Sequence, residues 1–182
     1  MSNEVINIAS KHLGQTVSDY SDQYDKSLLV KVPRKLNREA YGIDEDRLPF
    51  VGYDVWNAYE VSALTKRGRP ISGLLKIVCP SDSKYHVESK SIKLYLNSFN
   101  MTPLGNSGKD CIRLIEQKVA KDLSDLLETN VECKLHTGNS VDQFGNDTWT
   151  GFNEYENIEN LVNLDTVNFS AYKSDETQLE GD

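Results

Sequence analysis

Hydrophobic and polar positions alternate over Tyr53–Leu64, where β-branched and aromatic residues recur with a partial period of two. This pattern is typical of a half-buried β-strand. A turn containing Gly68 and Pro70 follows, and then a second apolar run, Ile71–Val78. Two such strands around a Gly/Pro turn predict a β-hairpin.

The next two segments repeat their apolar residues at helical spacing. Ser89 is the expected N-cap of the first helix, whose apolar stripe consists of Ile92, Tyr95, Leu96 and Phe99. A loop rich in Gly and Pro separates it from a longer helix that is expected to end near Asn130. The predicted stripe of this longer helix consists of Ile112, Ile115, Val119, Leu123 and Leu126.

Strand patterns return after the second helix, at Val131–His136, Thr148–Phe152 and Val162–Phe169. The resulting order, β-β-α-α-β-β, predicts an α+β fold in which an antiparallel sheet carries two helices on one face. Such an open sheet has unpaired edges, which favour association with a second domain or subunit. A homo-oligomer is therefore expected.

The organisation along the chain is expected to have three parts. Residues 1–50 are rich in polar and turn residues and predict an irregular N-terminal arm with one short helix near Val5–Leu13. Residues 51–170 form the folded module, and residues 171–182 form an acidic tail without periodicity.

Charge and composition restrict the function. The formal net charge is −8, which gives little attraction for a phosphate backbone, so a free base is a more plausible ligand than RNA or DNA. No apolar run is long enough to cross a membrane and no secretory signal is evident, so a cytoplasmic protein is expected. Cys79, Cys111 and Cys133 are expected to be reduced, and the few histidines form no metal-binding pattern, so no metal site is predicted.

The segment most suggestive of chemistry begins at Glu88. A carboxylate precedes a helix whose first turn carries two hydroxyls and a lysine, Ser89, Ser91 and Lys90. The free N–H groups and the positive end of the helix dipole make such a turn an anion site. An ionised carboxylate beside a pocket can also accept two parallel N–H bonds from a guanine-like edge. A capped helix with charged surface residues is the other interpretation, and the residues alone leave both open.

The run Glu88–Tyr95, Glu-Ser-Lys-Ser-Ile-Lys-Leu-Tyr, resembles the signature of the 7-cyano-7-deazaguanine reductases. Flanking segments resemble the longer, two-module class of this family in the same order along the chain. These are Tyr24–Leu29, Val32–Arg38, Leu48–Phe50, Asp54–Ser62 and Leu96–Asn100. The similarity covers about residues 18 to 102.

The resemblance implies a tunnelling fold (T-fold) and an NADPH-dependent enzyme of queuosine biosynthesis, in tRNA modification, that reduces a nitrile to a primary amine. It implies that Val87, Glu88 and Ser89 contact the substrate, 7-cyano-7-deazaguanine. It likewise implies that Ser89 and Lys90 contact NADPH.

The catalytic cysteine and aspartate of the family belong to a second module, and the segments that carry them do not occur in this chain. Cys79 is a weak substitute, because His86 rather than an aspartate stands seven residues later. A structural, buried role is expected for it. The chain is thus expected to be an inactive half, either excised from a longer protein or a natural half that works with a separate catalytic chain. A non-catalytic base-binding or scaffolding module and a diverged T-fold enzyme that uses Cys79 are the alternatives.

Overall fold

The computed structural model describes residues 23–137 and 160–163. The chain divides into two compact units, Met1–Trp149 and Thr150–Asp182. In the second unit the described residues 160–163 form a turn, so the strand predicted over 162–169 is wrong at its first two residues. Its remainder lies outside the described residues, as do the predicted helix Val5–Leu13 and the predicted strand Thr148–Phe152.

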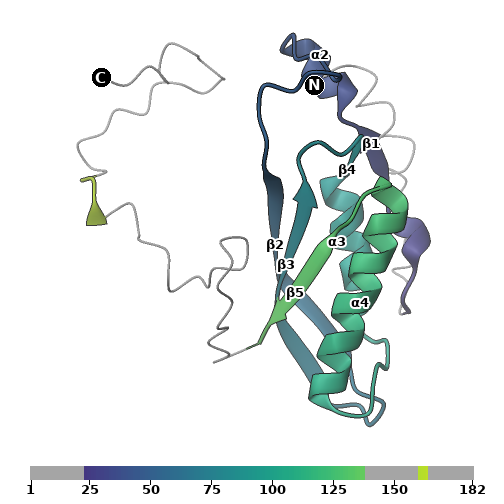
Figure 1. The fold of residues 1–182 in the computed structure, drawn as a ribbon. Helices are drawn as coiled ribbons and strands as arrows, with labels where there is room; N and C mark the ends of the chain where they lie inside the picture. The colour runs from purple at the N-terminus through teal and green to yellow at the C-terminus, as the bar shows by residue number, and fades with distance from the viewer. Residues whose placement is uncertain (1–22, 138–159, 164–182) are drawn as a thin grey trace. The chain divides into compact units, whose positions relative to one another are not determined.

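A three-stranded antiparallel sheet forms the base of the first unit (Figure 1). The strands are β2 (Tyr53–Leu64), β3 (Pro70–Pro80) and β5 (Glu132–His136), in the order β2-β3-β5. In the turn between β2 and β3, the Thr65 N–H donates to the Arg69 carbonyl at 2.8 Å. Gly68 adopts a φ of 79° there, a left-handed conformation that glycine accepts without strain. The predicted hairpin is confirmed.

A β-bulge divides β2 into two halves. In the first half the even-numbered residues face the helices, and in the second half the odd-numbered residues do. The pairing with β3 shifts between Ala58 and Val61. Before the shift, Trp56 and Ala58 pack against the core, whereas Val61 and Ala63 do so after it. Tyr59 and Glu60 are left exposed at the bulge. An inserted residue reverses which face of the strand each side chain occupies, which explains the merely partial alternation in the sequence.

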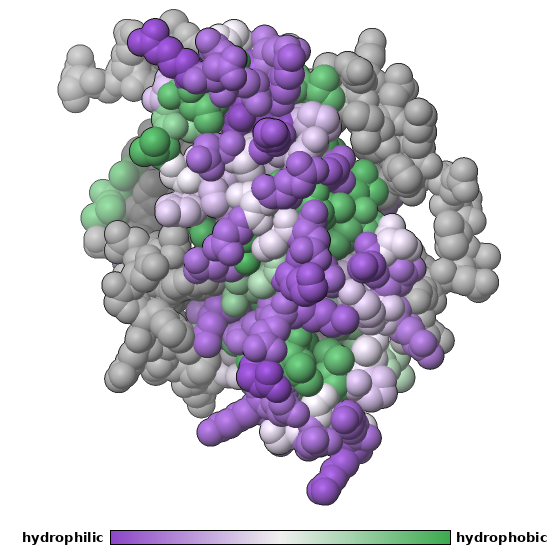
Figure 2. Space-filling model, turned by 45° about the vertical axis from the view of Figure 1, so that its right-hand side comes forward, coloured by the Kyte–Doolittle hydropathy of each residue, from purple (hydrophilic) through white to green (hydrophobic). Residues whose placement is uncertain are grey.

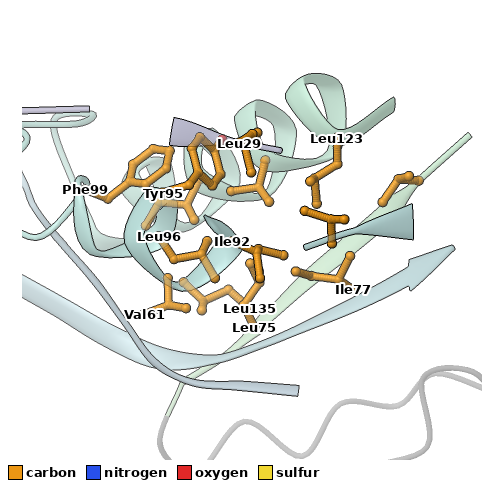
Figure 3. Packing of buried hydrophobic residues seen from close by; sticks show 14 of the residues in the cluster. Leu29, Val61, Leu75, Ile77, Ile92, Tyr95, Leu96, Phe99, Leu123 and Leu135 are labelled. Atoms are coloured by element: carbon orange, nitrogen blue, oxygen red, sulfur yellow. The ribbon is translucent and has the colours of Figure 1, made fainter. Parts of the chain in front are cut away.

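Both helices contribute to one hydrophobic core on a single face of the sheet. Figure 3 shows Ile92 of α3 (Ser89–Asn97) above Leu75 of β3, with Leu96 on the side of Val61 of β2 and Leu123 of the longer helix above Ile77 of β3. Alternate β3 residues point toward the helices, so the strand supplies the core with every second side chain. The α+β class with antiparallel strands is confirmed, while the strands predicted after β5 lie outside the described residues except at 162 and 163, which are not in a strand.

The longer helix, α4 (Gly108–Leu127), buries every fourth residue. The fully buried positions are Cys111, Ile115, Val119, Leu123 and Leu127. The prediction is wrong at both ends of this stripe, where Ile112 and Leu126 are only partly buried and pack along its edge. At each end of the stripe two adjacent residues are apolar, Cys111 with Ile112 and Leu126 with Leu127, so the sequence did not distinguish which residue of each pair is buried. Figure 2 shows that the side of the molecule turned toward the viewer is mostly hydrophilic, with smaller hydrophobic patches.

The predicted irregular arm is wrong for residues 23–50, which contain three short elements. These are a 3-10 helix η1 (Lys26–Leu28), a strand β1 (Lys31–Pro33) and a helix α2 (Lys35–Ala40). Strand β1 pairs antiparallel with β4 (Tyr85–Val87), which the sequence did not predict either. Segments of three residues are too short to show a period, and only their pairing across more than fifty residues makes them strands.

The described part of the arm is held to the helices and to the hairpin by polar contacts. The Tyr24 hydroxyl donates to Asp122 of α4 at 2.6 Å. The Arg34 guanidinium forms an ion pair with Asp54 of β2 and also donates to the Ser83 hydroxyl at 3.0 Å. Residues 23–50 are therefore an integral part of the first unit. Within the described residues, no helix is both long and apolar enough to cross a membrane.

Candidate functional site

Glu88 lies where β4 leads into α3 and is the N-cap of that helix. Its Oε1 accepts a hydrogen bond from the Lys90 N–H at 3.0 Å, and its Oε2 accepts one from the Ser91 N–H at 2.7 Å. The predicted N-cap, Ser89, is wrong, because this residue is already the first of the helix. The longer glutamate side chain reaches two amides of the first turn at once, which satisfies two of the donors that a helix start leaves unpaired.

This capping changes the predicted anion site. Two of the N–H groups expected to bind an external anion already bind the carboxylate that the chain itself supplies. The Ser89 hydroxyl adds a longer bond to Oε1, at 3.3 Å. Since each carboxylate oxygen offers two lone pairs, rotation of the Ser89 hydroxyl leaves one acceptor position on each oxygen. The site can then accept two parallel N–H donors without giving up its helix cap.

Ser91 fixes the backbone of Glu88 from the buried side of α3. Its hydroxyl donates to the Glu88 carbonyl at 2.8 Å and accepts from the Val30 N–H at 3.1 Å. The Glu88 N–H in turn donates to the Val30 carbonyl at 2.8 Å. Ser91 is 0% exposed. Ser91 was not predicted to hold this backbone, although a serine three residues after an N-cap can donate back to the carbonyl of that N-cap.

A second anchor holds the far half of α3. The Tyr95 hydroxyl donates to Asp122 at 2.7 Å, on the same oxygen that accepts from Tyr24. Burial, followed by the hydrogen bond to Asp122, raises the pKa of both tyrosines far above the ordinary value. The two hydroxyls therefore remain protonated donors. Tyr95 closes the eight-residue signature, and its side chain serves the fold.

The other residues predicted for substrate and cofactor lie close together because they are neighbours in the sequence. Val87 is 3% exposed and pairs with Lys31 across β1 and β4. Ser89 and Lys90 are exposed on the first turn of α3. Cys79 lies instead in the core, 3% exposed, with its Sγ 3.6 Å from the Ser83 hydroxyl oxygen.

A groove of about 370 Å³ runs between β2 and α3, here called the β2–α3 groove. Its polar lining from the helix consists of Ser89, Lys93 and Asn97, and its apolar lining includes Ile77, Ile92 and Leu96. Residues 56–60 of β2 form the opposite wall. Of the residues predicted for the site, Ser89 is the one that lines this groove.

A second, wider cleft of about 540 Å³ lies between α2 and β2. Its lining includes Arg34, Arg38 and His86, and it shares the Trp56 side chain with the β2–α3 groove. Both arginines have acidic partners: Arg34 pairs with Asp54, and Arg38 pairs with Glu45 at 2.8 Å. The cations of this cleft are therefore already neutralised by the chain.

His86 lies next to the signature and is held as a neutral imidazole. Its Nδ1 donates to the Val87 carbonyl at 3.2 Å. Burial lowers the pKa of His86, and the nearby Arg34 guanidinium acts in the same direction. Its Nε2 is buried without a hydrogen-bond partner in the described part of the chain. Among residues 23–137 and 160–163, no group of three or more His, Cys, Asp or Glu side chains could hold a metal ion.

The part of the chain that contains the site also matches known proteins. Residues 20–135 match the family described as "Nitrile reductase, 7-cyano-7-deazaguanine-reductase N-term". The chain belongs to this nitrile reductase family. The matched range includes the whole signature, both anchors of α3 and both cavities.

Three similar curated proteins, all from Rickettsia species, are each named NADPH-dependent 7-cyano-7-deazaguanine reductase. The protein of Rickettsia prowazekii is 42% identical over 148 residues, which are 81% of this chain and 49% of that protein. The Rickettsia akari protein is 41% identical over 138 residues, 76% of this chain and 48% of its own length. The Rickettsia typhi protein is 42% identical over 150 residues, 82% and 50% of the two chains. The chain thus spans about half the length of these reductases.

Proposed function

We propose that this chain is the substrate- and cofactor-contacting N-terminal half of an NADPH-dependent nitrile reductase. The reaction converts 7-cyano-7-deazaguanine to 7-aminomethyl-7-deazaguanine in the biosynthesis of queuosine. The observation that carries the proposal is the position of Glu88. Its carboxylate stands at an accessible helix start, beside a groove, with an acceptor position available on each oxygen once Ser89 rotates.

The roles proposed for substrate binding follow from the hydrogen-bond donors and acceptors at the start of α3. A deazaguanine ring presents adjacent N–H groups on one edge, and Glu88 accepts them in parallel. Ser89 supplies a hydroxyl that can switch from its 3.3 Å bond with Glu88 to the ligand. Val87 is buried, so it contributes its backbone and the rigidity of β4.

The cofactor role falls on Ser89 and Lys90. A cation in the first turn of a helix opposes the helix dipole, so Lys90 adds nothing there to helix stability. An exposed ammonium beside a hydroxyl suits the phosphates of NADPH, which the names of the relatives also specify as the reductant.

The nucleophile and the acid of the reaction come from a second module. Reduction of a nitrile to an amine takes up two hydrides and two protons, and covalent capture by a thiolate divides it into two steps. Cys79 is buried in the core and does not meet this need. The second module, as a continuation of the protein or as a separate chain, would meet this one in a T-fold assembly in the cytoplasm. The edge position of β2 in the described sheet and the β2-β3-β4-α3-α4-β5 order support that arrangement.

The test separates recognition of the base from capping of the helix. Glu88→Asp keeps a carboxylate and a good N-cap but withdraws the charge by one methylene group. Glu88→Gln keeps the length but turns an N–H toward the N–H donors of the base. Both variants should weaken binding of 7-cyano-7-deazaguanine by roughly 30-fold or more in calorimetry, since a charge-assisted contact is worth about 2–3 kcal/mol. The melting temperature of Glu88→Asp should change little.

Lys35→Gln is the control, because it changes one exposed charge of α2 outside both cavities. In addition, the chain alone should not consume NADPH, whereas mixing it with the C-terminal half of a two-module relative should restore turnover. Unchanged affinity for the base in both Glu88 variants would reduce Glu88 to a helix cap and leave the scaffolding alternative.

A further inference from the structure

The exposed side of α3 carries a polar stripe that continues beyond the first turn. Ser89, Lys93 and Asn97 are four residues apart and line the β2–α3 groove along the length of the helix. Lys90 is not among the described residues that line this groove. The cation of the groove is therefore Lys93, a signature residue that has no part in the function proposed above.

The floor of the groove is apolar, and its β2 wall carries an aromatic side chain. Ile92 and Leu96 are nearly completely buried beneath it, and the partly buried Trp56 stands in the wall that β2 supplies. A volume of about 370 Å³ falls within the range of small-molecule sites. An aromatic wall over an apolar floor favours a flat ring, because ring faces gain from offset stacking in addition to burial.

The polar groups decide what the edge of such a ring must carry. Lys93 offers donors alone, whereas Asn97 offers both a donor and an acceptor. Glu60, on the opposite side, also lines the groove and places a negative charge in it. A phosphate would gain from Lys93 but be repelled by Glu60, so an uncharged ring with an oxygen acceptor on its edge fits better.

We propose that the β2–α3 groove binds a planar heteroaromatic ring that carries a carbonyl or carboxamide oxygen. Trp56 lies against the ring, Lys93 donates to the oxygen, and Asn97 pairs with a neighbouring polar atom. On the proposed function, this chemistry has two sources, the deazaguanine base and the nicotinamide of the cofactor. Trp56, Lys93 and Asn97 are then specificity residues that extend the site from Ser89 along α3.

The fluorescence of Trp56 can report the binding of a ligand in the groove. The chain has two tryptophans, Trp56 and Trp149, and Trp149→Phe leaves Trp56 as the only one. The fluorescence of this variant is titrated with 7-cyano-7-deazaguanine and, separately, with nicotinamide mononucleotide. We expect saturable quenching below about 10 mM by one of the two, and that ligand identifies the source.

Two substitutions in this background locate the binding. Lys93→Ala and Asn97→Ala should each weaken the titration, Lys93→Ala by about tenfold or more because its hydrogen bond is charge-assisted. Lys35→Ala is the control, because it removes an exposed charge of α2 that lines neither cavity. It should shift the midpoint less than about twofold.

Absence of saturable quenching with both ligands, or equal effects of Lys35→Ala and Lys93→Ala, would overturn the proposal. If calorimetry shows that Glu88→Gln weakens base binding while Trp56 and Lys93 do not respond, the groove fails and the proposed function stands. If Trp56 and Lys93 respond while Glu88→Gln has no effect, the role of Glu88 fails and the groove stands.

Discussion

The two faces of α3 carry the same signature but have opposite relations to the rest of the molecule. The inner face, with Ser91 and Tyr95, is fully buried, and each of these residues bonds to a distant segment. The outer face, with Ser89, Lys90 and Lys93, is exposed to solvent. An eight-residue resemblance therefore combines residues that build the helix and residues free to meet a ligand. We therefore expect substitutions on the inner face to lower the free energy of unfolding and substitutions on the outer face to weaken ligand binding.

Glu88 belongs to both categories, because its carboxylate caps the helix and still offers acceptor positions outward. A loss of activity after a simple Glu88→Ala change would for this reason be ambiguous, and the paired Asp and Gln variants are needed. Unfolding free energies test whether the inner face behaves as a structural unit.

The largest effect is expected for Tyr95→Phe. This change removes a hydrogen bond from a fully buried hydroxyl to the Asp122 carboxylate. Hydrogen bonds to charged groups contribute about 1.5–3 kcal/mol, and urea unfolding should show a loss of that size. Tyr41→Phe, on a side chain 69% exposed, is the matched control and should stay within about 0.5 kcal/mol. Similar losses of unfolding free energy in the two variants would show that the Tyr95 hydroxyl does not stabilise the position of α3.

The next effect compares two serines of one motif. Ser91→Ala should cost about 1–3 kcal/mol, since it leaves the partly buried Val30 N–H without its acceptor. Ser89→Ala should cost less than about 0.5 kcal/mol, because its hydroxyl is exposed and its bond to Glu88 is long. The unfolding free energies of both variants, measured side by side, check the division between the faces. A larger loss of unfolding free energy in Ser89→Ala than in Ser91→Ala would contradict the assignment of Ser91 to the structural face.

The smallest effect concerns pH at His86, just before the signature. Burial lowers the pKa of folded His86 below the value of about 6.5 that it has in the unfolded chain. The unfolded state thus binds more protons around and below that pH, so stability is present above about pH 6.5 and is lost as the pH falls. The nearby carboxylates of Asp54 and Glu88 reduce the shift, and Arg34 increases it.

The loss of unfolding free energy between about pH 7.5 and 5.5 should accordingly be smaller in His86→Gln than in the unchanged chain. The variant removes the titrating group while retaining a polar side chain. An identical pH dependence in both proteins would show that His86 is not buried as a neutral ring.

Much of the fold could be read from local periodicity. The bounds predicted for the first hairpin strand coincide with β2, and Ile115, Val119 and Leu123 are buried as expected. The errors have local causes too. The glutamate cap of α3 was missed because Ser is the commoner N-cap, and the ends of the α4 stripe were misplaced because two adjacent residues are apolar at each end.

The sequence by itself determined an α+β module in which a helix follows Glu88 and carries Ser89 and Lys90 in its first turn, since charge and helical spacing act within a few residues. Only the tertiary structure decided that β1 and β4 are strands, that Tyr24 and Tyr95 share Asp122, and that Lys93 rather than Lys90 lines the groove. These features join segments some thirty to a hundred residues apart. Chain connectivity does not specify such contacts, and they arise because the bulged β2 and the two helices bury their apolar sides in one core.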